Sequence, residues 1–225
     1  MKLLTQFLDL LFPPRCAFCG SILRAEDSCV CVSCCSSLPF SGKNSKSADD
    51  FGRFDLCVSP FYYEGSVREA ILRFKFKNRR AYAACFGKLL ARCVLDELQG
   101  GFDIITWVPV SPERKRQRGY DQAKLLCEAA ARELGGAALP VLKKTRDAPP
   151  QPSLHSVEAR RKNAEGAFAA ASSGSLKGKR VLLIDDILTT GATLSAAATA
   201  LKASGVREVV CATLAKTQPE RKKSI

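Results

Sequence analysis

The segment Val181–Thr193, with the sequence VLLIDDILTTGAT, constrains the fold of this chain more than any other. A run of apolar residues, typical of a strand buried on both faces, ends at the adjacent acids Asp185 and Asp186. Three threonines and Gly191 follow before a helical pattern begins. Because ligands bind beyond the carboxyl ends of strands in open parallel sheets, we expect a ligand site here. Such a turn can direct backbone N–H groups and a helix N-terminus at one phosphate.

The segments around this one alternate between strand and helix patterns. The hydrophobic periodicity predicts strands at Leu56–Tyr63, Asp103–Val110, Val181–Asp185 and Glu208–Ala215. It predicts helices at Ser66–Phe76, Ala81–Leu98, Gly119–Leu134 and Ala192–Ala203. This order favours an α/β fold with a mostly parallel sheet that is covered by helices on both faces.

Other folds also end a strand in paired acids. A receiver domain has that strand near its start, whereas only 39 residues follow Asp186 here. A Walker B strand requires an upstream GxxxxGK[ST] loop, which the sequence lacks. A capped strand end with incidental threonines is the remaining alternative. No serine or cysteine nucleophile constellation is present, and the single histidine, His155, fits a solvated side chain better than a catalytic base.

The eleven cysteines fall into two groups. Five stand singly in apolar surroundings that favour small buried side chains: Cys57, Cys85, Cys93, Cys127 and Cys211. Six lie in the first 35 residues. Among these, two CxxC pairs with eleven residues between them are formed by Cys16, Cys19, Cys31 and Cys34. In a cytosolic protein such pairs predict a structural zinc site rather than disulfides. Cys29 and Cys35 compete as ligands, and redox chemistry or an inert cluster is the alternative.

Composition divides the chain into a small module and one larger domain. We expect an N-terminal helix and the cysteine module in residues 1–40, a linker in 41–55, the α/β domain in 56–218 and a basic tail in 219–225. No apolar run reaches the roughly 18 residues of a membrane span. The N-terminus lacks the cleavage site of a signal peptide, so a cytoplasmic protein is expected.

Positive charge is in excess, with 35 Lys and Arg against 22 Asp and Glu and a formal net charge of +13. Basic clusters lie at Arg73–Arg80, Glu113–Arg118, Ala159–Lys162 and Arg221–Lys223. This excess favours phosphate-bearing partners such as nucleotides or nucleic acid, although a solvated surface is the alternative for any one cluster. The polar, proline-rich segment Lys143–Asn163 is too long for a simple connection and predicts a functional or mobile loop.

Several of these motifs resemble those of one known family. VLLIDDILTTGAT resembles the 5-phosphoribosyl 1-pyrophosphate (PRPP) signature of type I phosphoribosyltransferases. WVPVSPERKRQRGYDQAKLL, the FKF of Phe74–Phe76 and the cysteine module resemble the ComF/GntX family over nearly the whole chain. The long loop adds that family's pattern at Gln151, Leu154, Arg160, Asn163 and Gly166–Phe168. The sequence departs from the family at Asp121, where asparagine is usual, and at Ser153 and His155.

The resemblance implies a type I phosphoribosyltransferase fold and a set of binding residues. Asp185 and Asp186 would hold the ribose 2′ and 3′ hydroxyls, and Thr189, Thr190, Gly191, Ala192 and Thr193 would hold the 5-phosphate. Arg114 and Arg118 would approach the pyrophosphate. The long loop would close over the site, with Lys144 and Arg146 as its transition-state contacts.

Two functions are compatible with the resemblance. One is an enzyme that transfers a phosphoribosyl group from PRPP, with Mg²⁺, to an unknown acceptor. The other is a protein of competence or DNA uptake that keeps the PRPP pocket and binds single-stranded DNA.

Overall fold

The computed structural model describes residues 13–24, 28–42, 53–145, 166–170 and 175–218. The expected N-terminal helix, the basic tail, Arg146, His155 and most of the predicted linker and long loop lie outside these ranges.

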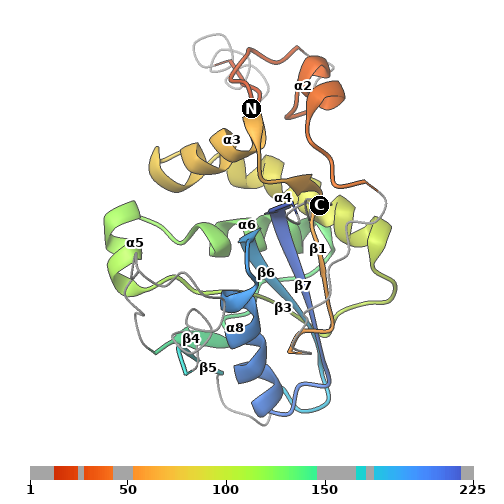
Figure 1. The fold of residues 1–225 in the computed structure, drawn as a ribbon, viewed down its shortest axis with the longest axis vertical. Helices are drawn as coiled ribbons and strands as arrows, with labels where there is room; N and C mark the ends of the chain where they lie inside the picture. Colours follow the sequence, from red (N-terminus) through yellow and green to blue (C-terminus); the bar gives the residue numbers. More distant parts are fainter. Residues whose placement is uncertain (1–12, 25–27, 43–52, 146–165, 171–174, 219–225) are drawn as a thin grey trace, which may run out of the picture.

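A sheet of five parallel strands forms the centre of the molecule (Figure 1). Its strands are β1 (Leu56–Val58), β2 (Phe61–Tyr62), β3 (Ile104–Trp107), β6 (Arg180–Leu188) and β7 (Glu208–Lys216). The order is β1-β7-β6-β3, and β2 also pairs with β7. The prediction of a parallel sheet is therefore confirmed, and β6, which carries the two acids, lies between two neighbours.

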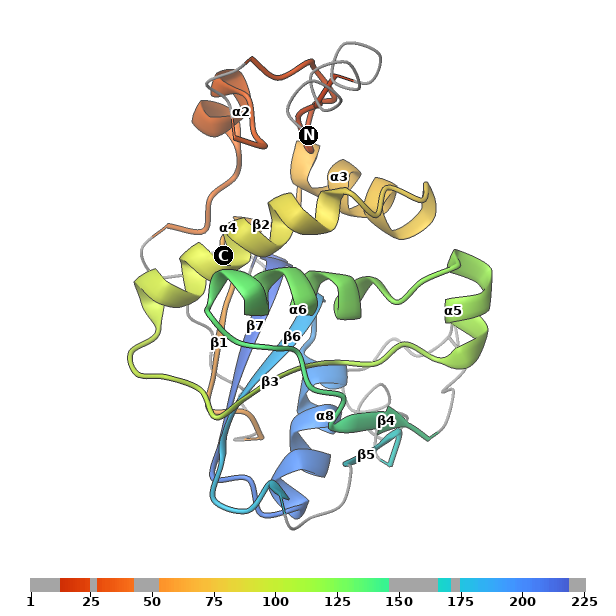
Figure 2. The same cartoon turned by 180° about the vertical axis from the view of Figure 1, so that it is seen from behind.

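Helices cover both faces of this sheet, as predicted (Figure 2). The helices α3 (Gly65–Phe76), α4 (Tyr82–Glu97) and α6 (Gln122–Glu133) share one core with Leu182 and Ile184 of β6. The helix α8 (Ala192–Ala203) shares a second core with Val181 and Leu183. Because successive strand residues face opposite sides, Asp186 continues the face toward α6 and Asp185 the face toward α8.

The predicted strand Leu56–Tyr63 is interrupted in the structure. Ser59 and Pro60 separate β1 from β2, although both strands pair with β7. Proline has no N–H to donate to a ladder. At the interruption the Ser59 and Thr213 hydroxyls are 2.6 Å apart, so a side-chain hydrogen bond joins the two strands instead.

Four short elements were not predicted. The helix α2 (Val32–Ser37) lies in the cysteine module, and β4 (Leu142–Lys144) pairs antiparallel with β5 (Phe168–Ala170). The helix α5 (Pro112–Arg118) contains the basic cluster Glu113–Arg118. Its ends follow ordinary capping rules, since the Ser111 hydroxyl accepts from the Arg114 N–H and Gly119 adopts a left-handed φ of 77°.

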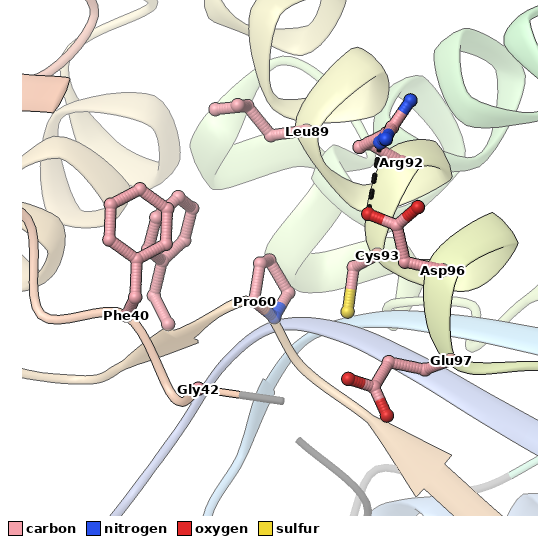
Figure 3. A pocket seen from close by; sticks show the side chains of 9 residues that line it. Phe40, Gly42, Pro60, Leu89, Arg92, Cys93, Asp96 and Glu97 are labelled. Carbon is pink, nitrogen blue, oxygen red and sulfur yellow. Dashed lines mark hydrogen bonds and ion pairs between the residues drawn. The ribbon is translucent and has the colours of Figure 1, made fainter. Parts of the chain in front are cut away.

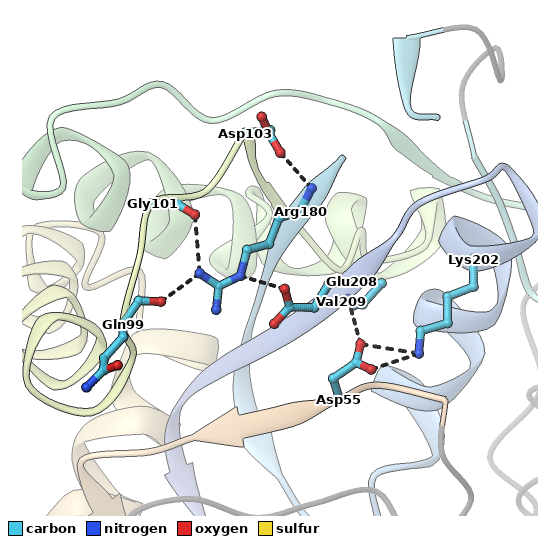
Figure 4. Close-up of polar contacts among 8 residues, drawn as sticks. All are labelled: Asp55, Gln99, Gly101, Asp103, Arg180, Lys202, Glu208 and Val209. Atoms are coloured by element: carbon cyan, nitrogen blue, oxygen red, sulfur yellow. Dashed lines mark hydrogen bonds and ion pairs between the residues drawn. The ribbon is translucent and has the colours of Figure 1, made fainter. Parts of the chain in front are cut away.

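Polar contacts join the amino ends of the strands, opposite the acids (Figure 4). Arg180 at the start of β6 donates its N–H to Asp103 at 2.7 Å and pairs with Glu208 at 2.8 Å. Asp55 accepts from the Val209 N–H at 2.8 Å and from Lys202 at 3.2 Å. The side chains at this end of the sheet are thus engaged in contacts that stabilise the fold.

The cysteine module packs directly on the larger domain. The Phe18 ring lies 5.5 Å from Phe61 and 5.7 Å from Phe86 between centroids, within the core that contains α3 and α4. Arg73 of α3 donates to the backbone carbonyls of Ala17 and Phe18. The module therefore shares its core with the α/β domain. No helix within the described ranges is both long enough and apolar enough to cross a membrane.

Candidate functional site

The two acids of β6 differ in their surroundings. Asp186 is buried, with 6% of its surface exposed, and its carboxylate accepts from two helices. Lys75 Nζ of α3 lies 2.8 Å from Asp186 Oδ1, and Gln122 Nε2 of α6 donates to Asp186 Oδ2 at 3.2 Å. Removing the Asp186 carboxylate would therefore leave the largely buried Lys75 ammonium without its partner.

Asp185 is half-buried and accepts from the backbone N–H of Asp186 at 2.8 Å. Desolvation, and then the neighbouring charge of Asp186, raise the pKa of the Asp185 carboxyl to about 8. The Lys75 ammonium acts in the opposite direction and lowers that pKa. One acid of the pair is therefore held as part of an ion pair, while the other keeps a proton near neutral pH.

The turn after β6 leads directly into the N-terminus of α8. Gly191 adopts a left-handed φ of 74° and is the N-cap of α8, without a side-chain cap. The first N–H groups of a helix have no intrahelical partner, and they carry partial positive charge. Thr189, Thr190 and Thr193 are exposed around them, and Ala192 is half-buried. The structure thus brings all five predicted phosphate-binding residues together beyond the strand end.

Motifs that are far apart in the sequence meet at Asp186. The FKF motif supplies Lys75, and the GYDQA motif supplies Gln122. Asp121 is the N-cap of α6, because its side chain accepts from the Lys124 N–H at 3.0 Å, and it also accepts from the Val110 N–H at 3.3 Å. Aspartate therefore performs here a capping task that asparagine can also perform. Sequence reasoning noted both motifs without finding Lys75 or Gln122 as contacts of the acids.

The two predicted pyrophosphate contacts lie on α5. Arg114 is exposed, whereas Arg118 is half-buried with its guanidinium 4.9 Å above the Phe76 ring. Burial lowers the pKa of Arg118, and the nearby charge of Asp186 raises it. Arg80, from the turn after α3, stacks in the same way over Tyr120 at 4.9 Å. The structure thus brings Arg118 near the acids and leaves Arg114 at the surface.

The predicted loop Lys143–Asn163 begins in a strand, because Lys143 and Lys144 belong to β4, which pairs with β5. Lys144 pairs with Phe168 in register, and the Thr145 N–H donates to Ala167 O at 2.9 Å. The segment between them therefore begins and ends at adjacent points. Lys144 Nζ lies 5.7 Å from the Phe168 ring centroid, while Arg146 lies outside the described residues.

The four predicted metal ligands converge in the N-terminal module. The Sγ atoms of Cys16, Cys19, Cys31 and Cys34 all lie within 4.8 Å of one another. Cys19 Sγ and Cys31 Sγ are 3.6 Å apart. Zinc–sulfur bonds of about 2.3 Å in a tetrahedron separate the sulfurs by about 3.8 Å, so this arrangement fits a zinc ion.

Neither competing cysteine belongs to this cluster. Cys35 is exposed, and Cys29 forms a disulfide with Cys85 of α4. The expectation that Cys85 is an isolated buried side chain is therefore wrong. The sequence separation of 56 between Cys29 and Cys85 explains why spacing gave no sign of this pairing. Cys57, Cys93, Cys127 and Cys211 are buried as expected.

A cavity of about 650 Å³ lies elsewhere, between α4 and the segment that leaves the module (Figure 3). Its walls include Phe40, Pro60, Leu89 and Cys93, with the ion pair of Arg92 and Asp96 at one side. None of the predicted site residues lines it, and we assign it no part in ligand binding.

Comparisons with known proteins agree with this architecture. Residues 122–225 match the phosphoribosyl transferase domain, and residues 7–46 match the double zinc ribbon domain. The chain is 28% identical to competence protein F of Haemophilus influenzae, over 87% of this chain and 93% of that protein. It is 26% identical to competence protein ComFC of Streptococcus pneumoniae, over 87% and 96%. It is 31% identical to DNA utilization protein YhgH of Salmonella typhi, over 70% of this chain and 72% of that protein. The chain belongs to the ComF family.

ComF membership confirms the predicted combination of a phosphoribosyltransferase domain and an N-terminal zinc-ribbon module. The domain implies a PRPP-like ligand. Among solved structures, the glutamine PRPP amidotransferase of B. subtilis is 23% identical with a TM-score of 0.43, over 63% of this chain and 30% of that one. That overlap is too partial to support a functional assignment.

Proposed function

We propose that this ComF protein binds PRPP with Mg²⁺ at the carboxyl end of β6 and transfers its phosphoribosyl group to an acceptor. The observation that supports this proposal is that the acid pair lies next to the Gly191 turn and to the N-terminus of α8, which has no side-chain cap. Carboxylates accept from the ribose hydroxyls, and the turn donates to the 5-phosphate. The zinc ribbon has a structural role, with the metal held by its four cysteines.

In the transfer, the bond between ribose C1 and the pyrophosphate oxygen breaks, and the oxygen leaves with the electron pair. A bond from an acceptor atom to C1 replaces it, and the proton that this atom carried is released to the departing pyrophosphate or to solvent. Positioned charge rather than a protein nucleophile stabilises such a step. Arg118 and Arg114 of α5 are the proposed contacts of the pyrophosphate, and Lys144 and Arg146 are the proposed transition-state contacts. Mg²⁺ would supply positive charge that stabilises the leaving pyrophosphate.

Calorimetry with PRPP and Mg²⁺ tests this function. At about pH 9, above the pKa of about 8 of Asp185, Asp185→Asn removes a charge-assisted acceptor for ribose hydroxyls. Such an acceptor is worth about 1.5 to 3 kcal/mol, so affinity at that pH should fall by about 10- to 100-fold. Asp96→Asn, on the exposed part of α4, is the matched control and should bind as the parent does. A parent protein that does not bind PRPP would overturn the proposal. Release of pyrophosphate with candidate acceptors then tests transfer.

A second function, the handling of single-stranded DNA, is favoured by the arginines around the site. Arg80, Arg114 and Arg118 lie on two neighbouring elements, and two of them stack on aromatic rings. Relatives carry the names of competence and DNA-utilisation proteins. Phosphate contacts release counterions, so affinity should fall by orders of magnitude between about 50 and 200 mM salt.

Anisotropy of a labelled oligonucleotide measures this binding. Arg80→Gln with Arg114→Gln should weaken it and reduce the salt slope, whereas Arg132→Gln on the far end of α6 should not. Binding that is indifferent to salt, or absent at low salt, would exclude this second function. Competition by PRPP shows whether the two ligands share the site.

A further inference from the structure

The ion pair of Lys75 and Asp186 crosses between two layers of the molecule. Lys75 belongs to α3 and Asp186 to β6, and only 15% and 8% of their side-chain surfaces are exposed. Their atoms are 2.8 Å apart, which is the distance of a charge-assisted hydrogen bond. At this depth an uncompensated charge is costly, so each partner fixes the other.

Asp186 is held from a second direction by Gln122 at 3.2 Å. Its two oxygens are therefore oriented by donors from two different helices. A carboxylate offers about four lone-pair positions, so two stay available for ligand hydroxyls. Gln122 Oε1 is buried and has no hydrogen-bond partner among the described residues. The network thus keeps acceptors for a ligand that donates hydrogen bonds.

We propose that Lys75 is a positioning residue for PRPP, because it holds the Asp186 carboxylate in the orientation from which the acid pair can accept from the ribose hydroxyls. This inference rests on the proposed PRPP binding. Lys75 acts through Asp186 and does not itself need to contact the ligand.

The alternative is that Lys75 contributes only to packing. The pKa of Asp185 distinguishes this packing role from the positioning role. The pKa of Asp185 responds to the charges of Asp186 on its own strand, Lys75 on α3 and Asp121 at the start of α6. Arg118 of α5 faces Asp186. Among these, Lys75 is the positive group that lowers the pKa of Asp185, whereas both acids raise it. Removing the Lys75 charge should therefore shift ligand binding to higher pH.

The experiment measures PRPP affinity by calorimetry, with Mg²⁺, across pH 6 to about 9, the range that brackets the raised pKa of Asp185. The variants are Lys75→Met, Lys75→Arg, and Lys88→Met as a control on the exposed face of α4. We expect Lys75→Met to weaken binding by about tenfold or more, the effect of one hydrogen bond to a charged group. Its binding should also require a higher pH. Lys75→Arg, which keeps the charge, should restore the parent's pH profile, and Lys88→Met should match the parent.

Three outcomes are decisive. A parent that does not bind PRPP overturns the proposed function and this inference with it. A parent that binds, together with a folded Lys75→Met variant of equal affinity and equal pH profile, overturns the inference alone. If Lys75→Met does not fold, Lys75→Gln replaces it, because the amide can still donate to Asp186 without the charge. An unchanged pH profile in Lys75→Gln would then reject the positioning role.

Discussion

Gly87 of α4 and Ala129 of α6 approach each other so closely that no side chain fits at Gly87. A Cβ there would lie 2.4 Å from the Ala129 Cβ and 2.7 Å from the backbone N of Ala130. Because backbone atoms cannot move aside as a flexible side chain can, this contact sets how near α6 lies to α4. It thereby helps to place Gln122, at the start of α6, against Asp186.

Gly87→Ala should therefore destabilise the protein, although alanine favours a helix by about 1 kcal/mol over glycine. Overpacking of this kind costs about 1 to 3 kcal/mol, so we expect a net loss in the free energy of unfolding. Gly101→Ala is the control, since nothing lies within 4 Å of a Cβ there. Urea denaturation measures both, and equal midpoints would contradict the prediction.

Cys16→Ser or Cys34→Ser should lose one equivalent of bound zinc. Both cysteines are buried members of the four-sulfur cluster, and small metal modules couple folding to metal binding. Cys35→Ser, at an exposed neighbour outside the cluster, should retain the metal. Elemental analysis under reducing conditions gives the stoichiometry. Zinc that is lost equally from all three variants, or absent from the parent, would refute the assignment.

The two adjacent acids should respond differently to the same substitution. Asp186→Asn leaves the Lys75 ammonium without its counter-charge, and hydrogen bonds to charged groups contribute about 1.5 to 3 kcal/mol. Asp185→Asn should change stability little at pH 7, because burial raises the pKa of Asp185 to about 8 and its carboxyl is already neutral there. Chemical denaturation of both variants compares them. A larger loss in Asp185→Asn would reverse the assigned roles.

Stability should fall as pH rises, through the titration of Asp185. A carboxyl with a raised pKa binds its proton more tightly in the folded chain, so its contribution is complete below the unfolded pKa of about 4. That contribution is lost as pH rises to about 8, the folded pKa of Asp185. Denaturant midpoints between these pH values measure the slope. Asp185→Asn should reduce it, and an identical slope in parent and variant would contradict the pKa assignment.

The long periodic segments could be read from the sequence. Helices α4, α6 and α8 and strands β6 and β7 lie within a few residues of their predicted positions, because each pattern reflects one buried face. The short elements could not be read in the same way. β4 and β5 have three residues each, too few for a period to appear. For α5 the capping signals were present, in Ser111 followed by Pro112 and in Gly119. The residues between them were interpreted only as a basic cluster.

The candidate site was likewise predictable only in part. Local sequence predicted the acids and their turn, since strand, acids and glycine are consecutive. The partners of Asp186 come from α3 and α6, and only the packing of these helices brings them to β6. The disulfide of Cys29 and Cys85 depends on tertiary structure in the same way. Such contacts leave no signal in the local sequence, because only the folded chain brings the two residues together.

Arg73 and Lys75 are two residues apart on α3, one donating to the Phe18 carbonyl beside a zinc ligand and the other to Asp186. Because both residues lie on one rigid helix, a cysteine module that relaxes when its metal leaves would displace Lys75 and, through it, the acid pair. Zinc retention and PRPP affinity then form one thermodynamic cycle. The factor by which bound zinc raises the affinity for PRPP must equal the factor by which bound PRPP raises the affinity for zinc. Chelator titrations with and without PRPP would measure the second of these factors.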